Sequence, residues 1–240
     1  MAIDLKGKWA LITGSSRGIG VQIARGLAAH GCNLVLHSRS AEGTESLKQE
    51  LEQQVRVTCI HGELSKQDDV DRIAGEARAN SQGIDILYNN AAIMTPFHDD
   101  IATVTAEDYR RSFEVNVITP IRLTFALLPF MLGKRFGRII QVTSGIKDQP
   151  ELMAYAASKA ALDKFVRDMT PRLRGTGVTM NLLDPGWLRT DLGGPRAPNP
   201  VESVLPGALV PALGENDLHG ELICAQDYVA EGGLIKRGLN

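Results

Sequence analysis

Apolar residues follow two alternating patterns along this chain. Short continuous runs are typical of strands that are buried on both faces of a parallel sheet. Such runs occupy residues 9–13, 34–36, 55–60, 84–88, 138–143 and 178–183, with a weaker seventh run at 221–225. Between them lie stretches in which apolar residues recur every three or four positions, as on one face of a helix. The two longest of these stretches cover residues 107–132 and 154–174.

Two of the predicted helices have recognisable ends. The first follows a glycine-rich turn and should end at Gly31, and its apolar face consists of Ile19, Ile23 and Leu27. The segment Ser65-Lys-Gln-Asp68 has the form of a capping box, which opens a helix. The apolar face expected for that helix consists of Val70, Ile73, Ala74 and Ala77.

The regular alternation of strands and helices predicts an α/β fold with right-handed crossovers. This is a doubly wound, Rossmann-like parallel sheet of about seven strands with helices on both faces. We expect residues 1–240 to form a single Rossmann-type domain, because no linker or repeat interrupts the pattern. The segment 184–211 is dense in proline and glycine. Irregular chain of that length is typical of a binding loop, and we expect a substrate lid at about 187–212.

Composition narrows the class of protein further. The 240 residues are 43% apolar and 22% charged, which suits one soluble domain with a large core. The net charge of −2 offers no general attraction for nucleic acid or for an anionic membrane. The N-terminus is charged, and no apolar run approaches the roughly 20 residues that span a bilayer. We therefore expect a cytoplasmic protein without nucleic-acid or membrane partners.

The cysteines and histidines favour a reducing compartment and argue against a metal site. The three cysteines, at 32, 59 and 224, are far apart and have no Cys-x-x-Cys spacing. The five histidines form no cluster with one another or with the cysteines. We expect no structural or catalytic metal.

The turn after the first strand carries the clearest motif, Thr13-Gly-Ser-Ser-Arg-Gly-Ile-Gly20. Glycines at 14, 18 and 20 let the backbone turn tightly and approach a pyrophosphate, while the following helix offers free N–H groups and the positive end of its dipole. Glycine turns are common, but this one lies between a strand and a helix, as the dinucleotide motif requires. A purely structural turn is the alternative interpretation.

The end of the second strand indicates which dinucleotide would bind. An NAD site usually places an acidic residue there to hold the ribose 2′-hydroxyl. Here the strand ends His37-Ser38-Arg39, and no carboxylate follows until Glu42. Arg39, with Arg17 from the glycine loop, is suited to hold a 2′-phosphate, so we expect NADP(H) to be preferred over NAD(H). Two solvated surface arginines would be the alternative.

The candidate catalytic pair is Tyr155 and Lys159. A spacing of four residues places both side chains on one helix face. A free tyrosine has a pKa of about 10 and is a poor base at neutral pH. The adjacent ammonium, with the positive nicotinamide ring of an oxidised cofactor, would stabilise the phenolate and lower that pKa. By itself, however, such a pair is common on helices.

Two polar residues strengthen the hypothesis. Ser144 follows the fifth strand, at the carboxyl edge of the sheet where ligands of doubly wound folds bind. Its hydroxyl can hold a substrate carbonyl oxygen beside the tyrosine. Asn116 lies in the apolar stretch Val115-Asn-Val117, where an amide is costly unless it is hydrogen-bonded. Asn116 is thus either a structural hydrogen-bonding group or a member of a proton relay.

Taken together, these motifs resemble the short-chain dehydrogenase/reductase family in its compact form of about 250 residues. The resemblance covers nearly the whole chain and includes Asn89-Asn-Ala-Ala92 and Pro185-Gly186. It implies that Tyr155 is the general acid/base and that Ser144 polarises the substrate oxygen. It also implies that Lys159 lowers the tyrosine pKa and holds the nicotinamide ribose, while Asn116 anchors a water that leads protons to bulk solvent.

The resemblance also implies a set of cofactor contacts. Residues 185–190 should lie at the nicotinamide end, with the Thr190 hydroxyl near the carboxamide. The full set of expected cofactor-binding residues is Gly14, Ser16, Arg17, Gly18, Ile19, Gly20, Ser38, Arg39, Glu63, Leu64, Asn90, Ala91, Tyr155, Lys159, Pro185, Gly186, Trp187, Leu188 and Thr190. The family usually assembles as a tetramer or dimer, so we expect a homo-oligomer formed through the helices at about 107–132 and 154–174.

Several positions depart from the family pattern. Ala92 replaces a glycine, and Glu63 stands where the family usually has an aspartate near the adenine. Ser144 and Tyr155 are 11 positions apart, fewer than usual, which shortens the loop beside the substrate. The Asp-Gly-Gly often found after the last strand is also missing. No catalytic group is lost, but the last two departures reshape the substrate pocket.

The substrate itself stays open at this point. The pocket should be formed by 145–153, Tyr155 and the expected lid, and its candidate lining is mostly apolar: Met94, Ile146, Met153, Trp187 and Leu192, with Lys147, Asp148 and Arg196 facing either way. A ketone, a sugar, a steroid, an acyl thioester or an imine would all be compatible.

Three functions follow from the motifs. The leading hypothesis is hydride transfer between NADP(H) and a small-molecule carbonyl or secondary alcohol. The alternative is a non-catalytic, dinucleotide-binding regulatory or sensor protein. Sugar-nucleotide epimerisation is disfavoured, because only 54 residues follow Gly186.

Overall fold

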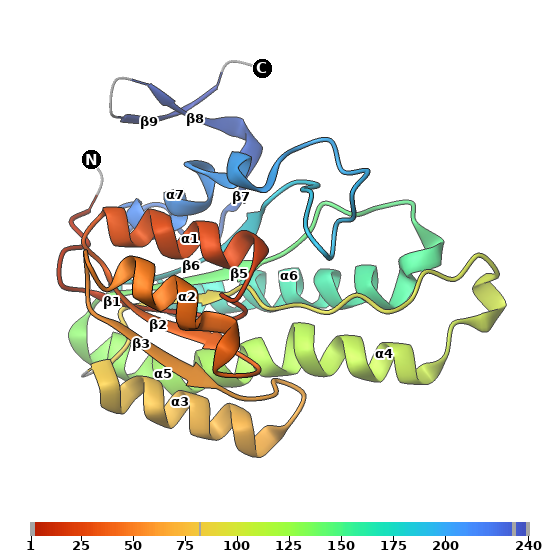
Figure 1. Ribbon diagram of the computed structural model, residues 1–240, viewed down its shortest axis with the longest axis horizontal. Helices are drawn as coiled ribbons and strands as arrows, with labels where there is room; N and C mark the ends of the chain where they lie inside the picture. The colour runs from red at the N-terminus through yellow and green to blue at the C-terminus, as the bar shows by residue number, and fades with distance from the viewer. Residues whose placement is uncertain (1–2, 82, 232–233, 239–240) are drawn as a thin grey trace.

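A computed structural model describes residues 3–81, 83–231 and 234–238 (Figure 1). Seven parallel strands form one sheet in the order β3-β2-β1-β4-β5-β6-β7. The strands are β1 (Trp9–Ile12), β2 (Asn33–Ser38), β3 (Val57–His61), β4 (Ile86–Asn89), β5 (Gly137–Val142), β6 (Val178–Asp184) and β7 (Leu222–Cys224). The order reverses between β1 and β4, which confirms the doubly wound, Rossmann-like fold.

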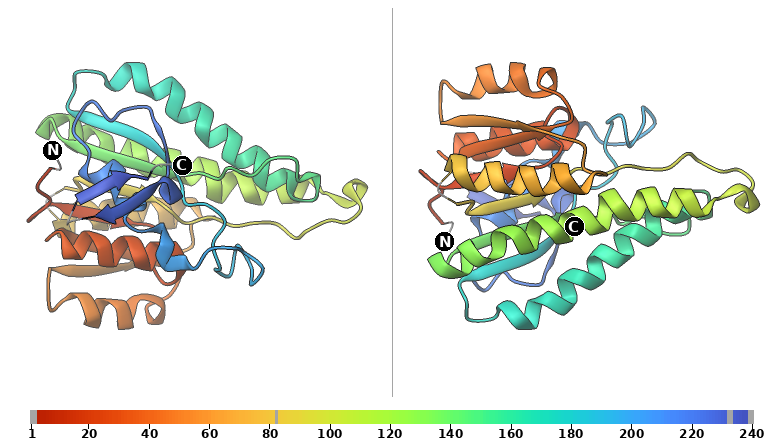
Figure 2. Two further views of the ribbon diagram at one scale, coloured as in Figure 1. Left: turned by 90° about the horizontal axis from the view of Figure 1, so that it is seen from above. Right: turned by 90° about the horizontal axis from the view of Figure 1, so that it is seen from below.

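Helices cover both faces of this sheet (Figures 1 and 2). One face carries α1 (Gly18–Ala29), α2 (Glu42–Leu51) and the short α7 (Val210–Leu213). The other carries α3 (Gln67–Ser81), α4 (Ala106–Phe113), α5 (Thr119–Lys134) and α6 (Met153–Leu173). Parallel strands need such crossovers, and the helices bury both faces of the sheet.

Successive residues of each strand enter two separate cores. Ala10 and Ile12 of β1 pack toward α1, whereas Trp9 and Leu11 pack toward the helices of the opposite face. All four residues are buried. Side chains alternate across a strand, so a strand that is covered on both sides must be apolar throughout. This is the physical reason why continuous apolar runs predicted the central strands.

The structure differs from the sequence expectations around α2 and α3. The ten-residue α2 was not predicted, because only Thr44, Leu47 and Leu51 of it are buried. The expected capping box at Ser65 is wrong, since α3 begins at Gln67. The carboxylate of Asp69 instead accepts a hydrogen bond from Glu63 N at 2.9 Å. A capping box does occur at Thr105, where it opens α4.

The long stretch predicted at 107–132 consists of α4, one π-helical turn at Glu114–Ile118 and α5. Residues 106–134 are long and apolar enough to cross a membrane by length and composition alone. In this structure, 56% of the most apolar window is buried inside the protein. Leu123, Leu127 and Met131 belong to the core on this face of the sheet.

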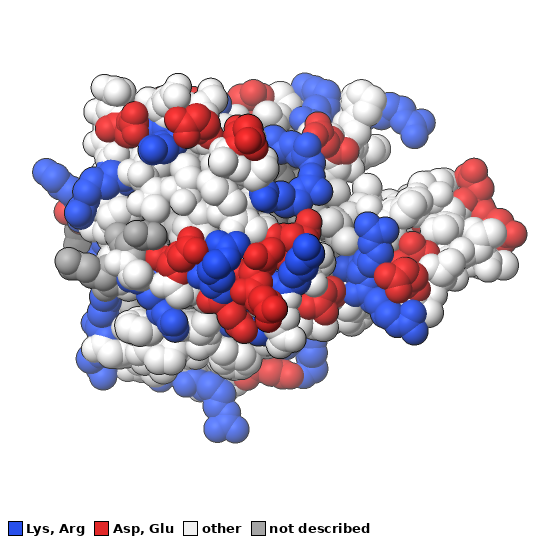
Figure 3. Space-filling view, turned by 60° about the horizontal axis from the view of Figure 1, so that its bottom comes forward, with Lys and Arg blue, Asp and Glu red and all other residues white. Residues whose placement is uncertain are grey.

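Charged side chains of both signs alternate over the outer surface on this side of the sheet, which Figure 3 shows in a space-filling view. Several form ion pairs, including Arg122 with Asp71 at 2.6 Å and Arg72 with Glu76 at 3.0 Å. Alternating signs leave no broad field of one sign on the face drawn.

The chain after β6 has a loop part and a core part. Residues 187–200 form an exposed loop, held to itself by a bridge between Leu188 and Asn199. Residues 201–213 enter the core beside α1, where Val204, Ala208, Leu209 and Ala212 are buried. The chain then forms β7 and an antiparallel hairpin of β8 (Tyr228–Glu231) and β9 (Leu234–Arg237), which was not predicted.

Candidate active site

The glycine loop joins β1 to α1 at the carboxyl edge of the sheet. Gly14 and Gly18 have φ values of 67° and 59°, a backbone region that side chains disfavour. A Cβ at Gly20 would lie 2.3 Å from Gly14 O, so the turn closes only around glycine. The first N–H groups of α1 therefore face the space beside the loop. This arrangement fits a pyrophosphate group.

Residues after β4 hold this loop in place. Asn90 Nδ2 donates to Thr13 O at 2.9 Å and to Gly14 O at 3.1 Å. Thr13 Oγ1 accepts hydrogen bonds from Asn90 N and Ala91 N, both at 3.0 Å. The side chain of Asn90 thus shapes the loop, and a Cβ at Gly14 would meet Ala91 at 3.0 Å.

His37 connects the loop to the end of β3. Its Nδ1 accepts a hydrogen bond from Gly14 N at 3.2 Å, and its Nε2 lies 3.1 Å from Gly62 O. Accepting at Nδ1 leaves the proton on Nε2, so the ring is neutral. Burial lowers the pKa of His37 to about 4. His37 was not expected as a site residue from the sequence, because only the fold brings residues 14, 37 and 62 together.

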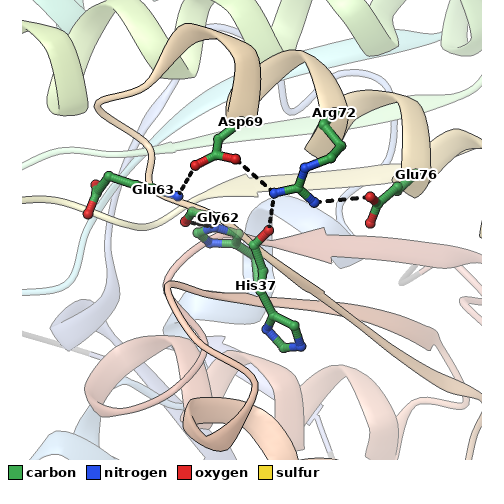
Figure 4. Close-up of polar contacts among 7 residues, drawn as sticks. His37, Gly62, Glu63, Asp69, Arg72 and Glu76 are labelled. Atoms are coloured by element: carbon green, nitrogen blue, oxygen red, sulfur yellow. Dashed lines mark hydrogen bonds and ion pairs between the residues drawn. The ribbon is translucent and has the colours of Figure 1, made fainter.

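The adenine end of the expected site lies where β3 enters α3 (Figure 4). Arg72 donates to His61 O at 2.7 Å and pairs with Asp69 at 2.9 Å. Glu63 lies beside this group, where its backbone N–H binds Asp69 and its carboxylate accepts from Ser65 N at 3.2 Å. Leu64 is buried in the core, and its carbonyl oxygen accepts a hydrogen bond from Thr119 Oγ1 at 2.6 Å.

The two arginines expected at a 2′-phosphate are both exposed. Arg39 directly follows β2, after Ser38 whose hydroxyl donates to Ser40 O. Arg17 lies in the glycine loop and forms an ion pair with Asp191 of the 187–200 loop at 2.9 Å. The side chains of Arg17 and Asp191 are 65% and 71% exposed, so solvent screens this pair strongly.

The candidate catalytic side chains come from α6 and from the end of β5. Tyr155 and Lys159 are 7% and 3% exposed, one turn apart on α6. Lys159 Nζ lies 5.7 Å from the Tyr155 ring centroid and donates to Val142 O at 2.7 Å. Ser144, two residues beyond Val142, lies near enough to the Tyr155 hydroxyl to lower its pKa. The structure therefore brings three of the four expected catalytic residues together.

The ionisation of these groups follows from their burial. Burial raises the pKa of Tyr155, the side chain of Ser144 lowers it, and the negative charge of Asp184 raises it again. Burial lowers the pKa of Lys159 to about 8, while the carboxylate of Asp163 acts in the opposite direction. In the protein alone, Tyr155 is a protonated phenol at neutral pH.

The fourth residue, Asn116, lies in the π-helical turn and is fully buried. Its side chain accepts from Ile93 N and donates to Ile93 O, both at 2.9 Å. It also donates to Ser158 Oγ at 3.0 Å, and Ser158 Oγ donates to Tyr155 O at 2.7 Å. The amide thus joins the chain after β4 to the first turn of α6.

Asp163 is a further acidic residue beside the candidate site, and it was not expected from the sequence. It lies one turn beyond Lys159 on α6 and accepts a hydrogen bond from Thr143 Oγ1 at 2.5 Å. Burial raises the pKa of Asp163, whereas Thr143 and the nearby Lys159 lower it. The i, i+4 spacing from Lys159 was visible in the sequence, but its proximity to Thr143 depends on how α6 packs on β5.

The expected nicotinamide end is formed by the turn after β6. Asp184 Oδ1 accepts from Gly186 N at 2.9 Å, which shapes the turn over Pro185. A Cβ at Gly18 would lie 3.5 Å from Thr190 Cγ2, so this segment faces the glycine loop. Trp187 is 58% exposed and donates to Gly193 O at 2.8 Å.

The sequence profile of the short chain dehydrogenase family matches residues 8–200 of this chain. The chain belongs to that family. Nodulation protein G of Rhizobium sp. (strain N33) is 36% identical over 190 residues, covering 78% of this chain and 76% of that protein. D-beta-hydroxybutyrate dehydrogenase of Cupriavidus necator is 33% identical over 191 residues, covering 78% of this chain and 73% of that enzyme. The family assignment makes the protein an oxidoreductase of the short-chain dehydrogenase/reductase type.

Solved structures agree with this assignment. A 3-oxoacyl (acyl-carrier-protein) reductase from Agrobacterium tumefaciens, with NADP bound, superposes with a TM-score of 0.82 at 27% identity, covering 92% of this chain and 93% of that chain. A blue fluorescent protein from a metagenomic library, in complex with NADPH, superposes with a TM-score of 0.81 at 29% identity, covering 92% and 97%.

Proposed function

We propose that this protein transfers a hydride between NADP(H) and a carbonyl or secondary alcohol substrate, with Tyr155 as the general acid/base. The observation that carries the proposal is the buried group of Tyr155, Lys159 and Ser144 at the carboxyl edge of the sheet. This edge is where doubly wound folds bind dinucleotides, and the glycine loop opens on the same edge.

The dinucleotide would be held by the residues expected from the sequence. The glycine loop and the start of α1 would bind the pyrophosphate, and Asn90 would support that loop from behind. Lys159 would bind the nicotinamide ribose, and residues 185–190 would contact the nicotinamide end. Bound in this way, NADP(H) supplies or accepts the hydride, and the protein handles the proton.

Tyr155 is suited to the acid role in carbonyl reduction. Its phenol is protonated, and its hydroxyl lies near Ser144, the second group that would hold the substrate oxygen. In reduction, the O–H of Tyr155 donates its proton to the oxygen that gains negative charge. In the reverse direction, the ammonium of Lys159 would stabilise the phenolate that accepts the proton.

The proposed route for proton exchange runs along α6. Asn116 would anchor a water near Lys159. The side-chain amide of Asn116 is already engaged by Ile93 and Ser158, so its role in the described contacts is to hold the backbone around the site. A water in such a relay would then bind the backbone of the π-helical turn that contains Asn116 and the amine of Lys159.

The preference for NADP(H) rests on charge at the end of β2. Arg39 follows Ser38 without a carboxylate in the strand, and Arg17 extends from the loop on the opposite side. A guanidinium binds a phosphate dianion far better than it binds a ribose hydroxyl. The two structural neighbours described above contain NADP or NADPH, which supports the same preference.

Three further features belong to this proposal. Of the lid expected at about 187–212, residues 201–212 lie in or against the core, so the largely exposed loop 187–200 would act as the substrate lid, within a single domain. The helices α4, α5 and α6 would form the contact in a homo-oligomer, since Ile118 of the π-helical turn and Phe125 of α5 are 42% and 51% exposed. The enzyme would work in the cytoplasm on a small molecule, without a metal, nucleic acid or membrane.

The test compares Tyr155→Phe with the unchanged protein across a panel of ketones, sugars and polyols, with NADPH oxidation followed by absorbance. Loss of the hydroxyl should reduce kcat by at least about a hundredfold, while the dissociation constant for NADPH changes little. Replacement of the half-buried Tyr109, which lies on α4 outside the candidate site, by Phe is the matched control. NADPH binding without turnover of any panel compound by the unchanged protein would instead favour a dinucleotide sensor.

A further inference from the structure

Asp184 is the last residue of β6 and lies between the catalytic group and the edge strand β7. Its Oδ1 accepts a hydrogen bond from Gly186 N at 2.9 Å, which fixes the direction of the carboxyl group. The second oxygen, Oδ2, takes part in no hydrogen bond among the described residues. Asp184 is only partly buried, so this oxygen remains accessible to a ligand.

The residue after Ser144 leaves room for this carboxylate. A Cβ at Gly145 would lie 2.6 Å from Asp184 Oδ2, closer than any real contact allows. The φ angle of Gly145 is not positive, so its backbone would accept another residue. A side chain at 145 would therefore have to displace the carboxylate of Asp184. The carboxylate of Asp184 occupies the volume beside Ser144 that a side chain at 145 would fill.

The charge of Asp184 is not neutralised locally. Within the described ranges, no lysine, arginine or histidine forms a salt bridge with it. Burial raises the pKa of Tyr155, Asp163 and Cys224, and the negative charge of Asp184 adds to the shift in each case. A single anion thus acts on groups from α6 and from β7.

We propose that Asp184 is a specificity-determining residue that selects carbonyl substrates with a hydrogen-bond donor near the reacting carbon and rejects those with a carboxylate there. The inference rests on the proposed function and adds the substrate class. A hydroxyl or amino group beside the carbonyl would donate to the free Oδ2. A substrate carboxylate would lose its hydration in the pocket and face a like charge.

The mouth of the pocket limits the remainder of such a substrate. Trp187, Met153 and Leu192 are 58%, 39% and 38% exposed, and all three lie in segments that flank the catalytic group. In the proposed substrate site, their side chains would form an apolar rim around a polar floor of Ser144, Tyr155 and Asp184. The substrate class that fits is therefore an apolar hydroxyketone or aminoketone, or the secondary alcohol that corresponds to either of them.

The experiment uses two ketones of nearly equal size, 2-hydroxyacetophenone and benzoylformate, which carry a hydroxymethyl group or a carboxylate beside the same aryl carbonyl. A second pair on an alkyl chain gives an independent scaffold. The ratio of kcat/KM values, hydroxyketone over keto acid, is measured for the unchanged protein and for Asp184→Asn. Asparagine keeps an Oδ1 that accepts from Gly186 N, so the turn is preserved while the charge is removed.

We expect Asp184→Asn to reduce this ratio by at least about tenfold, mainly through faster turnover of the keto acid. Asp227→Asn is the matched control, because it removes a carboxylate that also acts on Cys224 but pairs with Arg237 at 3.1 Å. The control should keep the original ratio. A ratio in Asp184→Asn within twofold of that of the unchanged protein would overturn the inference.

Gly145→Ala provides a second variant that retains every charge. Its Cβ must displace Oδ2, so the same ratio should fall while NADPH binding is kept. If the kcat/KM ratio is unchanged in both variants while the hydroxyketone is turned over normally, the inferred role of Asp184 is wrong and the proposed function stands. Absence of turnover of every compound by the unchanged protein overturns the proposed function and this inference with it.

Discussion

His37 and Gly14 are joined by a hydrogen bond of 3.2 Å, in which the backbone N–H of the glycine donates to Nδ1 of the ring. The other ring nitrogen, Nε2, donates to Gly62 O at 3.1 Å. The neutral imidazole therefore links the turn after β1 with the end of β3. Protonation of Nδ1 would break the first contact, because a charged ring has no acceptor.

Acid should weaken the fold through His37. Burial lowers the folded pKa of His37 to about 4 from an ordinary value of 6.5. Between these values the unfolded chain binds more protons, so stability falls as the pH drops from 6.5 toward 4. The loss reaches about 3 kcal/mol at most, from 1.36 kcal/mol per pKa unit. Urea unfolding of the unchanged protein and of His37→Asn, at pH 7.5, 6 and 5, measures this contribution.

The His37→Asn variant should start less stable at pH 7.5 and should lose less on acidification. His30→Asn is the control, since His30 is exposed at the end of α1. It should retain the full pH dependence. Equal slopes in the two variants would show that another group is responsible.

Replacement of Gly20 by alanine should disrupt the dinucleotide site. The new Cβ would lie 2.3 Å from Gly14 O, a backbone atom that cannot move without opening the loop. We expect NADPH affinity to fall at least about tenfold and stability to fall by about 2 kcal/mol. Isothermal titration and thermal unfolding measure the two effects.

Gly75→Ala is the matched control for this change. Gly75 lies within α3, and nothing lies within 4 Å of a Cβ placed there. Alanine in a helix interior is better than glycine by about 0.5–1 kcal/mol, so this variant should be slightly more stable. An equal loss of NADPH affinity in both variants would contradict the steric argument.

Charge reversal at Arg39 should change the cofactor preference. In Arg39→Asp, a carboxylate at the end of β2 would repel the 2′-phosphate and accept a bond from a ribose hydroxyl. The KM for NADPH should rise at least about tenfold and the KM for NADH should fall. Arg110→Asp, on the exposed face of α4, controls for the change in net charge. A parallel rise of both KM values would argue against a direct contact with the phosphate.

Removal of the Asn116 amide should cost stability as well as activity. In Asn116→Ala, the N–H and C=O of Ile93 lose their side-chain partners inside the protein. Each unsatisfied buried group costs about 1–3 kcal/mol, so we expect a loss of at least about 2 kcal/mol in unfolding experiments. Ser158→Ala removes the hydrogen bonds of Ser158 Oγ with Asn116 and with Tyr155 O but leaves both bonds to Ile93 in place, so it should lose less. A fall in kcat without any fall in stability would point to a direct role in proton transfer.

The sequence predicted the parts of the fold that burial dictates. The seven strands and the long helices α5 and α6 were identified, because a sheet covered on both faces requires apolar runs and the helices require one apolar face. Helix α2 was not predicted, because its buried apolar residues are Leu47 and Leu51 and two such residues give little apolar periodicity. The hairpin of β8 and β9 is largely exposed, so its pattern carries no sign of a core.

The candidate site was predicted where the motif lies in continuous sequence and missed where packing assembles it. Tyr155, Lys159 and the glycine loop follow local spacings, and the structure places them on one edge of the sheet. His37, Asp163 and Asp184 gain their significance from partners 20 or more positions away, such as Gly14 and Thr143. Short spacings in a sequence cannot report such contacts.

The fluorescence of the exposed indole of Trp187 reports on the surroundings of the 187–200 loop. The chain has only two tryptophans, and the other, Trp9, is 7% exposed in the first strand. Trp187 is 58% exposed at the start of the 187–200 loop. Acrylamide therefore quenches the emission of one tryptophan selectively. A blue shift and reduced quenching on addition of dinucleotide or ketone would follow the closing of this loop in solution, without any label.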